Sequence, residues 1–188
     1  MSTDELSSNA SEPEAIDAHV LELLASGLPR RAPTERMRES LLRLAGGRER
    51  FLPFLDRMMV LFDLPEAQAQ GHLRGIDDDE VWDDMLPGVR FHDFDGGPAI
   101  GEAHGGLVRL EPGQAFPRHT HVGEERLLVL QGELRDDEGR RYLAGDLVVS
   151  PDGSTHELRA VGDREAIYAA VVTALEIVGL DDDDDDDD

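Results

Sequence analysis

Cysteine is absent from this 188-residue sequence, and aromatic residues are scarce, with one Trp, two Tyr and six Phe. Without thiols the chain can form neither disulfides nor thiolate metal sites, and thiol redox chemistry is excluded. The longest apolar runs fall far short of the roughly 20 residues that a membrane-spanning helix needs. The first residues are acidic and polar, unlike a secretory signal, so we expect a cytoplasmic protein.

Basic residues are also few, because 18 Lys and Arg stand against 42 Asp and Glu, for a formal net charge of −24. Residues 181–188 are all Asp; without these eight, 34 acidic residues still exceed the 18 basic ones. Such a surface repels phosphate backbones and anionic lipids, so we expect neither a nucleic acid nor a membrane as partner. Hydrophobic residues make up 39% of the chain, which is enough for the core of one domain.

The composition divides the chain into four predicted segments. Residues 1–14 are rich in Ser, Glu and Asp and are predicted to be disordered, like the acidic tail at 181–188. Residues 15–86 form a helical segment and residues 87–180 a β domain. In the helical segment we expect helices at 15–26, 35–46, 48–64 (with Pro53 in its first turn), 65–76 and 77–85.

Short β-prone runs separated by Gly, Pro and Asp begin near Pro87. Eight such runs within about 90 residues, without a long helix, predict a sandwich or barrel. The last run is rich in Ala, but its β-branched residues favour a strand. The runs cover residues 89–94, 106–110, 115–121, 125–134, 140–145, 146–151, 156–161 and 166–178.

The stretch "PRHTHVGEERLLVLQG" carries the candidate chemistry. His119 and His121 are two residues apart, so in a strand both imidazoles face one side. Glu125 can join them only if the chain turns, and Gly123 permits that turn. We favour Glu125 over Glu124 because Glu125 shares the parity of the apolar residues that follow it.

A second stretch, "GDLVVSPDGSTHELRA", brings His156 back after a turn. Three imidazoles and one carboxylate would leave one or two coordination positions of a divalent ion open.

Together these stretches resemble the two motifs of the cupin superfamily. The first motif runs from Gly113 to Gly132, and the second from Gly145 to Ala160, where Ala160 stands in place of the family's asparagine. The resemblance covers about residues 88–178. It implies a mainly β fold, a small cupin jelly-roll β-barrel preceded by a helical N-terminal segment, with one divalent metal ion. The implied metal ligands are His119, His121, Glu125 and His156.

A narrower resemblance, which includes "LPRRAPTERMRESLLRLAG", is to ChrR-type anti-sigma factors. It implies a regulatory or sensor module, a sigma factor as partner, and zinc, with nickel, iron and manganese as alternative ions. The family's sigma-binding domain uses a cysteine-containing zinc site, whereas this chain has Leu23 and Ser26 at the two Cys positions after His19. The helical segment is therefore either a cysteine-free remnant or a dimerisation element, and we expect a homodimer.

The alternative is a small metal-dependent cupin dioxygenase or isomerase that acts on a small organic substrate, so enzymatic activity stays open. The expected interior is apolar and favours a small apolar ligand or none. We expect Trp82 to pack the helical segment onto the barrel, and His104 to be nearer the cavity than His19, His72 or His92. The few polar candidates for the interior are Arg109, Gln131, Tyr142, Arg159 and Tyr168.

Overall fold

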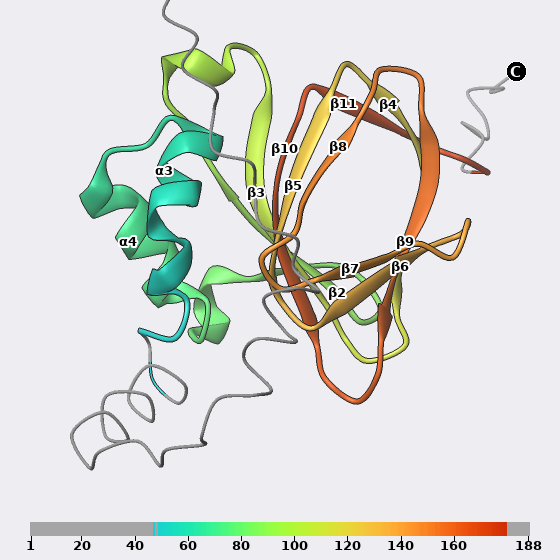
Figure 1. Cartoon of the computed structure of the whole chain (residues 1–188), viewed down its shortest axis with the longest axis horizontal. Helices are drawn as coiled ribbons and strands as arrows, with labels where there is room; N and C mark the ends of the chain where they lie inside the picture. The colour runs from blue at the N-terminus through green and yellow to red at the C-terminus, as the bar shows by residue number, and fades with distance from the viewer. Residues whose placement is uncertain (1–46, 48, 180–188) are drawn as a thin grey trace, which may run out of the picture. The chain divides into compact units, whose positions relative to one another are not determined.

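The structure, a computed structural model, describes residue 47 and residues 49–179 (Figure 1). The predicted disordered segment at 1–14, the predicted helices at 15–26 and 35–46, His19, and the acidic tail all lie outside the described residues. None of the helices within the described part combines the length and the apolar character that crossing a bilayer requires.

Within the described residues, two α-helices precede the first strand. A 3-10 turn, η1 (Leu52–Phe54), leads into α3 (Leu55–Phe62), and Pro53 lies in that first turn as predicted. α3 ends at Asp63, which takes the left-handed conformation with φ of 53°. α4 (Glu66–Gly75) follows where the sequence predicts a helix.

The predicted helix at 77–85 is wrong in its second half. Residues Asp79–Val81 form a short 3-10 turn, η2, and the chain then continues as the strand β1 (Asp83–Leu86). Trp82 explains the change, because its buried indole donates a hydrogen bond to the Ile76 carbonyl at 3.0 Å while its backbone is extended. Once the chain is extended, β1 pairs antiparallel with the next strand.

The described residues contain eleven strands, where the sequence predicts eight. Two of the predicted runs each form two strands: Gly132, with φ of 77°, separates β5 from β6, and Thr173 separates β10 from β11. The strand β1 was not predicted from the sequence. The other strands are β2 (Val89–Phe94), β3 (His104–Leu110), β4 (Ala115–Val122), β5 (Glu125–Gln131), β6 (Glu133–Asp136), β7 (Arg141–Leu143), β8 (Leu147–Ser150), β9 (Thr155–Val161), β10 (Ala166–Val172) and β11 (Ala174–Ile177).

The strands form two antiparallel sheets that face each other as a jelly roll (Figure 1). The six-stranded sheet has the order β1-β2-β3-β10-β5-β8, and the five-stranded sheet has the order β11-β4-β9-β6-β7. The predicted mainly β fold with a jelly-roll arrangement is confirmed. Within the described residues no strand pairing joins the two sheets, so they do not close into the hydrogen-bonded barrel that we expected.

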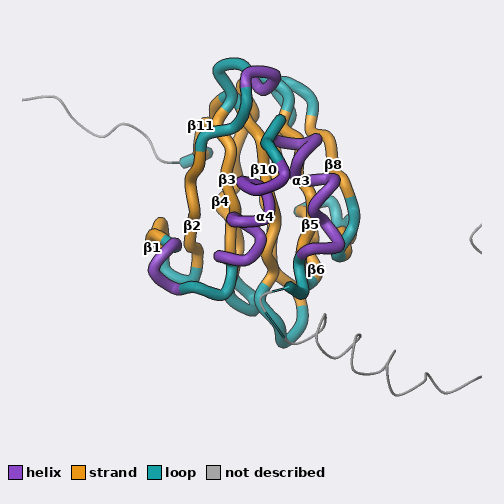
Figure 2. Tube along the Cα trace, turned by 90° about the vertical axis from the view of Figure 1, so that its left-hand side faces the viewer, coloured by secondary structure: helices purple, strands orange, loops and turns teal. Residues whose placement is uncertain are grey.

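The six-stranded sheet is covered on both faces. Figure 2 shows α3 and α4 lying over its outer face, where Leu128 and Ile167 pack against Met58 and Phe62. The inner face packs against the other sheet, and its side chains include Leu127. Because neighbouring residues of a strand point to opposite faces, β5 and β10 must be apolar at nearly every position.

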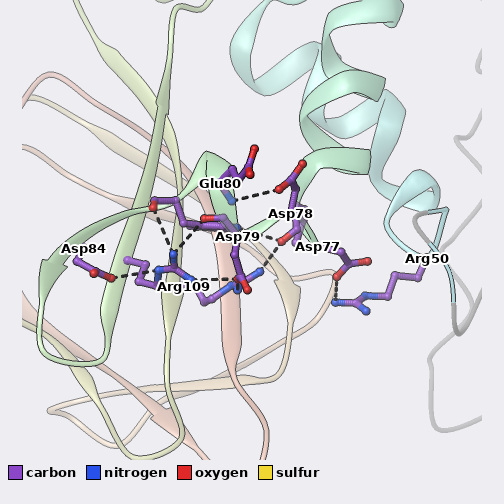
Figure 3. Close-up of polar contacts among 10 residues, drawn as sticks. Arg50, Asp77, Asp78, Asp79, Glu80, Asp84 and Arg109 are labelled. Atoms are coloured by element: carbon purple, nitrogen blue, oxygen red, sulfur yellow. Dashed lines mark hydrogen bonds and ion pairs between the residues drawn. The ribbon is translucent and has the colours of Figure 1, made fainter.

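Asp79 connects the helical layer to the sheet. One oxygen of its carboxylate, Oδ1, accepts hydrogen bonds from Arg90 at 3.1 Å and from Arg109 at 3.3 Å (Figure 3). The Arg109 guanidinium lies 4.4 Å from the centre of the Trp82 ring and donates to the Ile76 carbonyl. Trp82 packs the helical segment onto the sheet as predicted. Arg109, in contrast, faces the helical layer and not the jelly-roll interior.

A histidine pair also lies between this layer and the sheet. His72 of α4 and His92 of β2 are partly buried, with 3.2 Å between Nδ1 of His72 and Nε2 of His92. The His72 ring also stacks on Phe94 at a centroid distance of 3.9 Å. Burial lowers the pKa of both histidines, and the neighbouring His92 lowers the pKa of His72 further. The carboxylates of Asp93 and Asp83 raise the pKa of His92, against the larger effect of burial.

We predict that this pair makes folding stability depend on pH. Because the folded-state pKa values are lowered, the unfolded chain binds more protons, so stability is lost as the pH falls below about 6.5, the unfolded value. His72→Gln removes one of the two titrating groups. In urea unfolding, the wild type should therefore lose more stability between pH 7.5 and pH 5.5 than His72→Gln does. Equal losses in the two proteins would contradict this prediction.

Candidate metal centre

The strand β4 presents His119 and His121 to the jelly-roll interior. Both residues are 1% exposed, while Thr120 between them points away and its hydroxyl lies 2.9 Å from that of Thr155. His119 is directly opposite His156 in the antiparallel pairing of β4 with β9. Strand parity and register thus bring three imidazoles from two stretches of sequence together, with ring centres 4.7 to 4.8 Å apart.

The turn between β4 and β5 brings Glu125 to these histidines. Gly123 has φ of 86°, a conformation that favours glycine, and a Cβ there would lie 2.7 Å from Thr173 Oγ1. Glu125 begins β5 and is 4% exposed. Glu124 is exposed and forms an ion pair with Arg126 at 2.8 Å. Of the two neighbouring carboxylates, only Glu125 lies beside the imidazoles.

The candidate ligand atoms of His119, His121, Glu125 and His156 all lie within 4.8 Å of one another. Nε2 of His121 is 3.2 Å from Nε2 of His156 and 3.6 Å from Oε2 of Glu125. Nε2 of His156 is 3.8 Å from the same carboxylate oxygen. Three nitrogens and one oxygen therefore converge, which is a donor set that suits zinc, nickel or iron.

Hydrogen bonding fixes the state of one imidazole. Nδ1 of His119 lies 2.7 Å from the Pro117 carbonyl oxygen, and because a carbonyl only accepts, Nδ1 carries the hydrogen. Nε2 of His119 then presents its lone pair to the cluster, and it is buried without a hydrogen-bond partner. Buried polar atoms are rarely left unpaired in proteins. A cation bound to this atom would satisfy it, and metal-binding histidines usually have such an anchored second nitrogen.

The surroundings of the cluster shift the pKa values of its groups toward their uncharged forms. Burial lowers the pKa of His119, and together with neighbouring imidazoles it lowers the pKa values of His121 and His156 to about 4. Burial raises the pKa of Glu125 to about 7, against the effect of the hydrogen bond that Ser150 donates at 3.4 Å. Neutral imidazoles are the form that binds metals, and a divalent cation would stabilise the ionised carboxylate.

An apolar chamber of about 130 Å³ adjoins the cluster. His119, Glu125 and Tyr168 line it, and so does His104, which is exposed at its edge. Its apolar walls include Phe91, Val108, Phe116, Ala170, Val172 and Leu175.

Five polar residues were candidates for the interior, some of which were expected to face outward by strand alternation, and of the five only Tyr168 lines the chamber. Gln131 instead donates to the Glu165 carbonyl, and Arg159 is exposed and donates to the Gly113 carbonyl. Tyr142 donates to Asp136. These contacts were not predictable from strand parity alone, because they depend on the turns that end the strands.

Comparison with known proteins identifies the family. The family model described as the ChrR cupin-like domain matches residues 72–175, which is more than half of the chain. The chain belongs to the ChrR cupin-like family. As a ChrR-type cupin it is 40% identical, over 95 residues, to the anti-sigma-E factor ChrR of Cereibacter sphaeroides. That match covers 47% of this chain and 44% of the relative, so the chain spans less than half the length of the relative that it matches.

Several solved structures are similar to this ChrR-type cupin. The complex of Rhodobacter sphaeroides SigE with the anti-sigma ChrR matches with 27% identity and a TM-score of 0.49, over 82% of this chain and 75% of that one. An acetylacetone dioxygenase from Acinetobacter johnsonii matches with 14% identity and a TM-score of 0.47, over 56% and 75% of the two chains. KdgF from a Halomonas species matches with 21% identity and a TM-score of 0.44, over 53% and 91%. The activities in these names are properties of those proteins.

We predict that His119→Ala or His156→Ala lowers the metal content of the purified protein at least about tenfold, since a first-sphere imidazole is lost. His104→Ala is the matched control, because His104 lines the chamber without belonging to the cluster. Elemental analysis after dialysis measures the metal content. Unchanged stoichiometry in both cluster variants would contradict the assignment of these ligands.

Proposed function

We propose that this ChrR-type cupin is a regulatory module that binds one divalent metal ion through His119, His121, Glu125 and His156. The observation that carries the proposal is the convergence of four buried or nearly buried donor groups within 4.8 Å, including the unpaired Nε2 of His119. Membership of the ChrR cupin-like family supports a regulatory role. When bound, the metal would supply a Lewis-acidic centre and hold β4, β5 and β9 together at this end of the jelly roll.

Zinc is the ion that we propose for a regulatory module. Zinc has no redox chemistry of its own and accepts nitrogen and oxygen ligands in flexible geometries. Nickel, iron or manganese could occupy the same donors, because affinity at nitrogen and oxygen sites follows the metal series rather than the biological role. The ion that is isolated therefore depends on the metals available during growth.

We further propose that the partner is a sigma factor of the extracytoplasmic-function class. The support is the name of the curated relative, an anti-sigma-E factor that is 40% identical over 95 residues. The proposed contact region is the predicted helical segment before residue 47. Since the chain has no cysteine, this region would have to bind through its predicted apolar stripes and not through a thiolate zinc site. Homodimer formation and cytoplasmic location remain predictions.

A small cupin dioxygenase or isomerase is the second candidate, and the apolar chamber is the observation in its favour. A cavity of about 150 Å³ with apolar walls can bind benzene, so about 130 Å³ could hold a small apolar molecule. Among the described residues that line the chamber beyond the metal cluster, however, only Tyr168 and His104 have hydrogen-bonding side chains. A catalytic site would be expected to have more such groups to orient a substrate.

The sigma-factor proposal predicts a stable one-to-one complex between the full chain and an extracytoplasmic-function sigma factor from the same genome. Met37, Leu41, Leu42 and Leu44 are predicted to form an apolar stripe on the helix at 35–46. Leu41→Asp in this stripe should weaken binding at least about tenfold, because it places a charge in the contact. Ser40→Asp adds the same charge outside that stripe and should bind like the wild type. Calorimetry and size-exclusion chromatography measure the complex. Absence of wild-type binding, or equal weakening by both variants, would contradict the proposal.

A further inference from the structure

A second hollow, of about 350 Å³, also reaches the candidate metal centre. We call it the lateral pocket; its lining includes Asp136, Arg140, Tyr142, Val148, Ser154 and His156. It shares no lining residue with the apolar chamber, because it is formed by β6 to β9 and the turns between them. The candidate site is thus approached by two hollows of different chemistry.

His156 is the candidate ligand that the lateral pocket reaches. Its side chain is 14% exposed, compared with 5% for Glu125 and 0% for His121, and His119 as a residue is 1% exposed. His156 is also the second residue of β9, directly after the turn that begins at Pro151. Among the four groups it therefore has the most space in which to move.

A third approach, between the turns that carry the ligands, is closed by hydrogen bonds. The N–H of Gly153 donates to the His121 carbonyl, and the N–H of His121 donates to the Ser154 carbonyl, both at 2.9 Å. The N–H of Gly123 donates to the Asp152 carboxylate at 2.8 Å. These bonds join the β4–β5 turn to the β8–β9 turn and close the space between them.

The two hollows differ in what a hydrated cation would encounter. In the apolar chamber the ion would have to shed water against Phe, Val and Leu side chains, which is costly. The lateral pocket contains the carboxylates of Asp136, Asp137 and Glu138 and the guanidinium of Arg140. Arg140 pairs with Asp136 and Glu138, and Arg118 pairs with Asp137, so three carboxylates face two guanidiniums and one negative charge is left over. The remaining negative charge attracts a cation, and the polar lining allows it to keep its water. The polar lining continues to the imidazole of His156.

We propose that a divalent cation enters and leaves the candidate site through the lateral pocket, and that His156 is the ligand that moves aside to admit it. The apolar chamber then remains available to an uncharged ligand while the ion is exchanged. This inference rests on the proposed metal binding and adds its route. It implies that Val148 and the acidic residues 136–138 affect the rates at which the metal ion enters and leaves. They need not affect the equilibrium affinity of the site for the ion.

The test makes the same substitution, Val to Phe, once in the lateral pocket and once in the apolar chamber. Val148 lines the lateral pocket and Val172 lines the apolar chamber, and both valines are partly buried. Val148→Phe and Val172→Phe add the same bulk to one route each. With Co²⁺ as probe, stopped-flow absorbance would follow uptake by the metal-free full chain and release to an excess of chelator.

We expect Val148→Phe to slow uptake and release at least about tenfold, and to leave the equilibrium dissociation constant within about threefold. A blocked route raises the barrier in both directions but does not change the end states. Val172→Phe should keep both rates within about twofold of the wild type. Slower exchange in Val172→Phe alone, or unchanged exchange in Val148→Phe, would overturn the route.

A charge variant keeps the proposal testable if Val148→Phe does not fold. Asp137→Asn combined with Glu138→Gln should slow Co²⁺ uptake severalfold and reduce its dependence on salt, since the steering charges are removed. Uptake that stays unchanged in this variant would overturn the route. A wild-type chain that binds no Co²⁺ at all would instead remove the proposed metal function, so the two failures are distinguishable.

Discussion

The pairing of β4 with β9 is the constraint on which the candidate metal centre depends. Two histidines of β4 share a face by strand parity, but only the antiparallel register places His156 opposite His119. The turns at the end of these strands are hydrogen-bonded to each other through Gly153 and His121. Because backbone contacts fix the register and the turns together, the four side chains converge.

Convergence has an electrostatic cost that the rest of the fold must offset. Three imidazoles and a carboxyl group are held in a buried site, where burial moves their pKa values toward the uncharged forms. Buried polar groups without partners are destabilising by roughly 1–3 kcal/mol each. The apolar packing on both faces of the six-stranded sheet opposes that cost, since α3 and α4 cover one face and the second sheet covers the other.

The sequence predicted the site better than it predicted the strands. The four candidate site residues were predicted from strand parity, the glycine at the turn and the resemblance to the two cupin motifs, and the structure brings them within 4.8 Å of one another. The boundaries of helices and strands were harder to predict. The local composition of residues 77–85 favours a helix, yet the chain is extended at Trp82, whose buried indole is hydrogen-bonded to Ile76. Arg109 was a candidate for the interior, but a partner 30 residues away, Asp79, holds it on the outer face. Such long-range contacts are not visible in local patterns.

Strand β5 lies between the helical layer and the metal centre, with Glu125 and Leu127 on the inner side and Arg126 and Leu128 on the outer side. A slip of this strand by a single residue would exchange the two faces. A slip in one direction would bring the guanidinium of Arg126 to the site in place of a carboxylate, whereas a slip in the other direction would bring the carboxylate of Glu124. The order of these residues thus makes one of the two misregistered forms place a cation where a metal ligand should be.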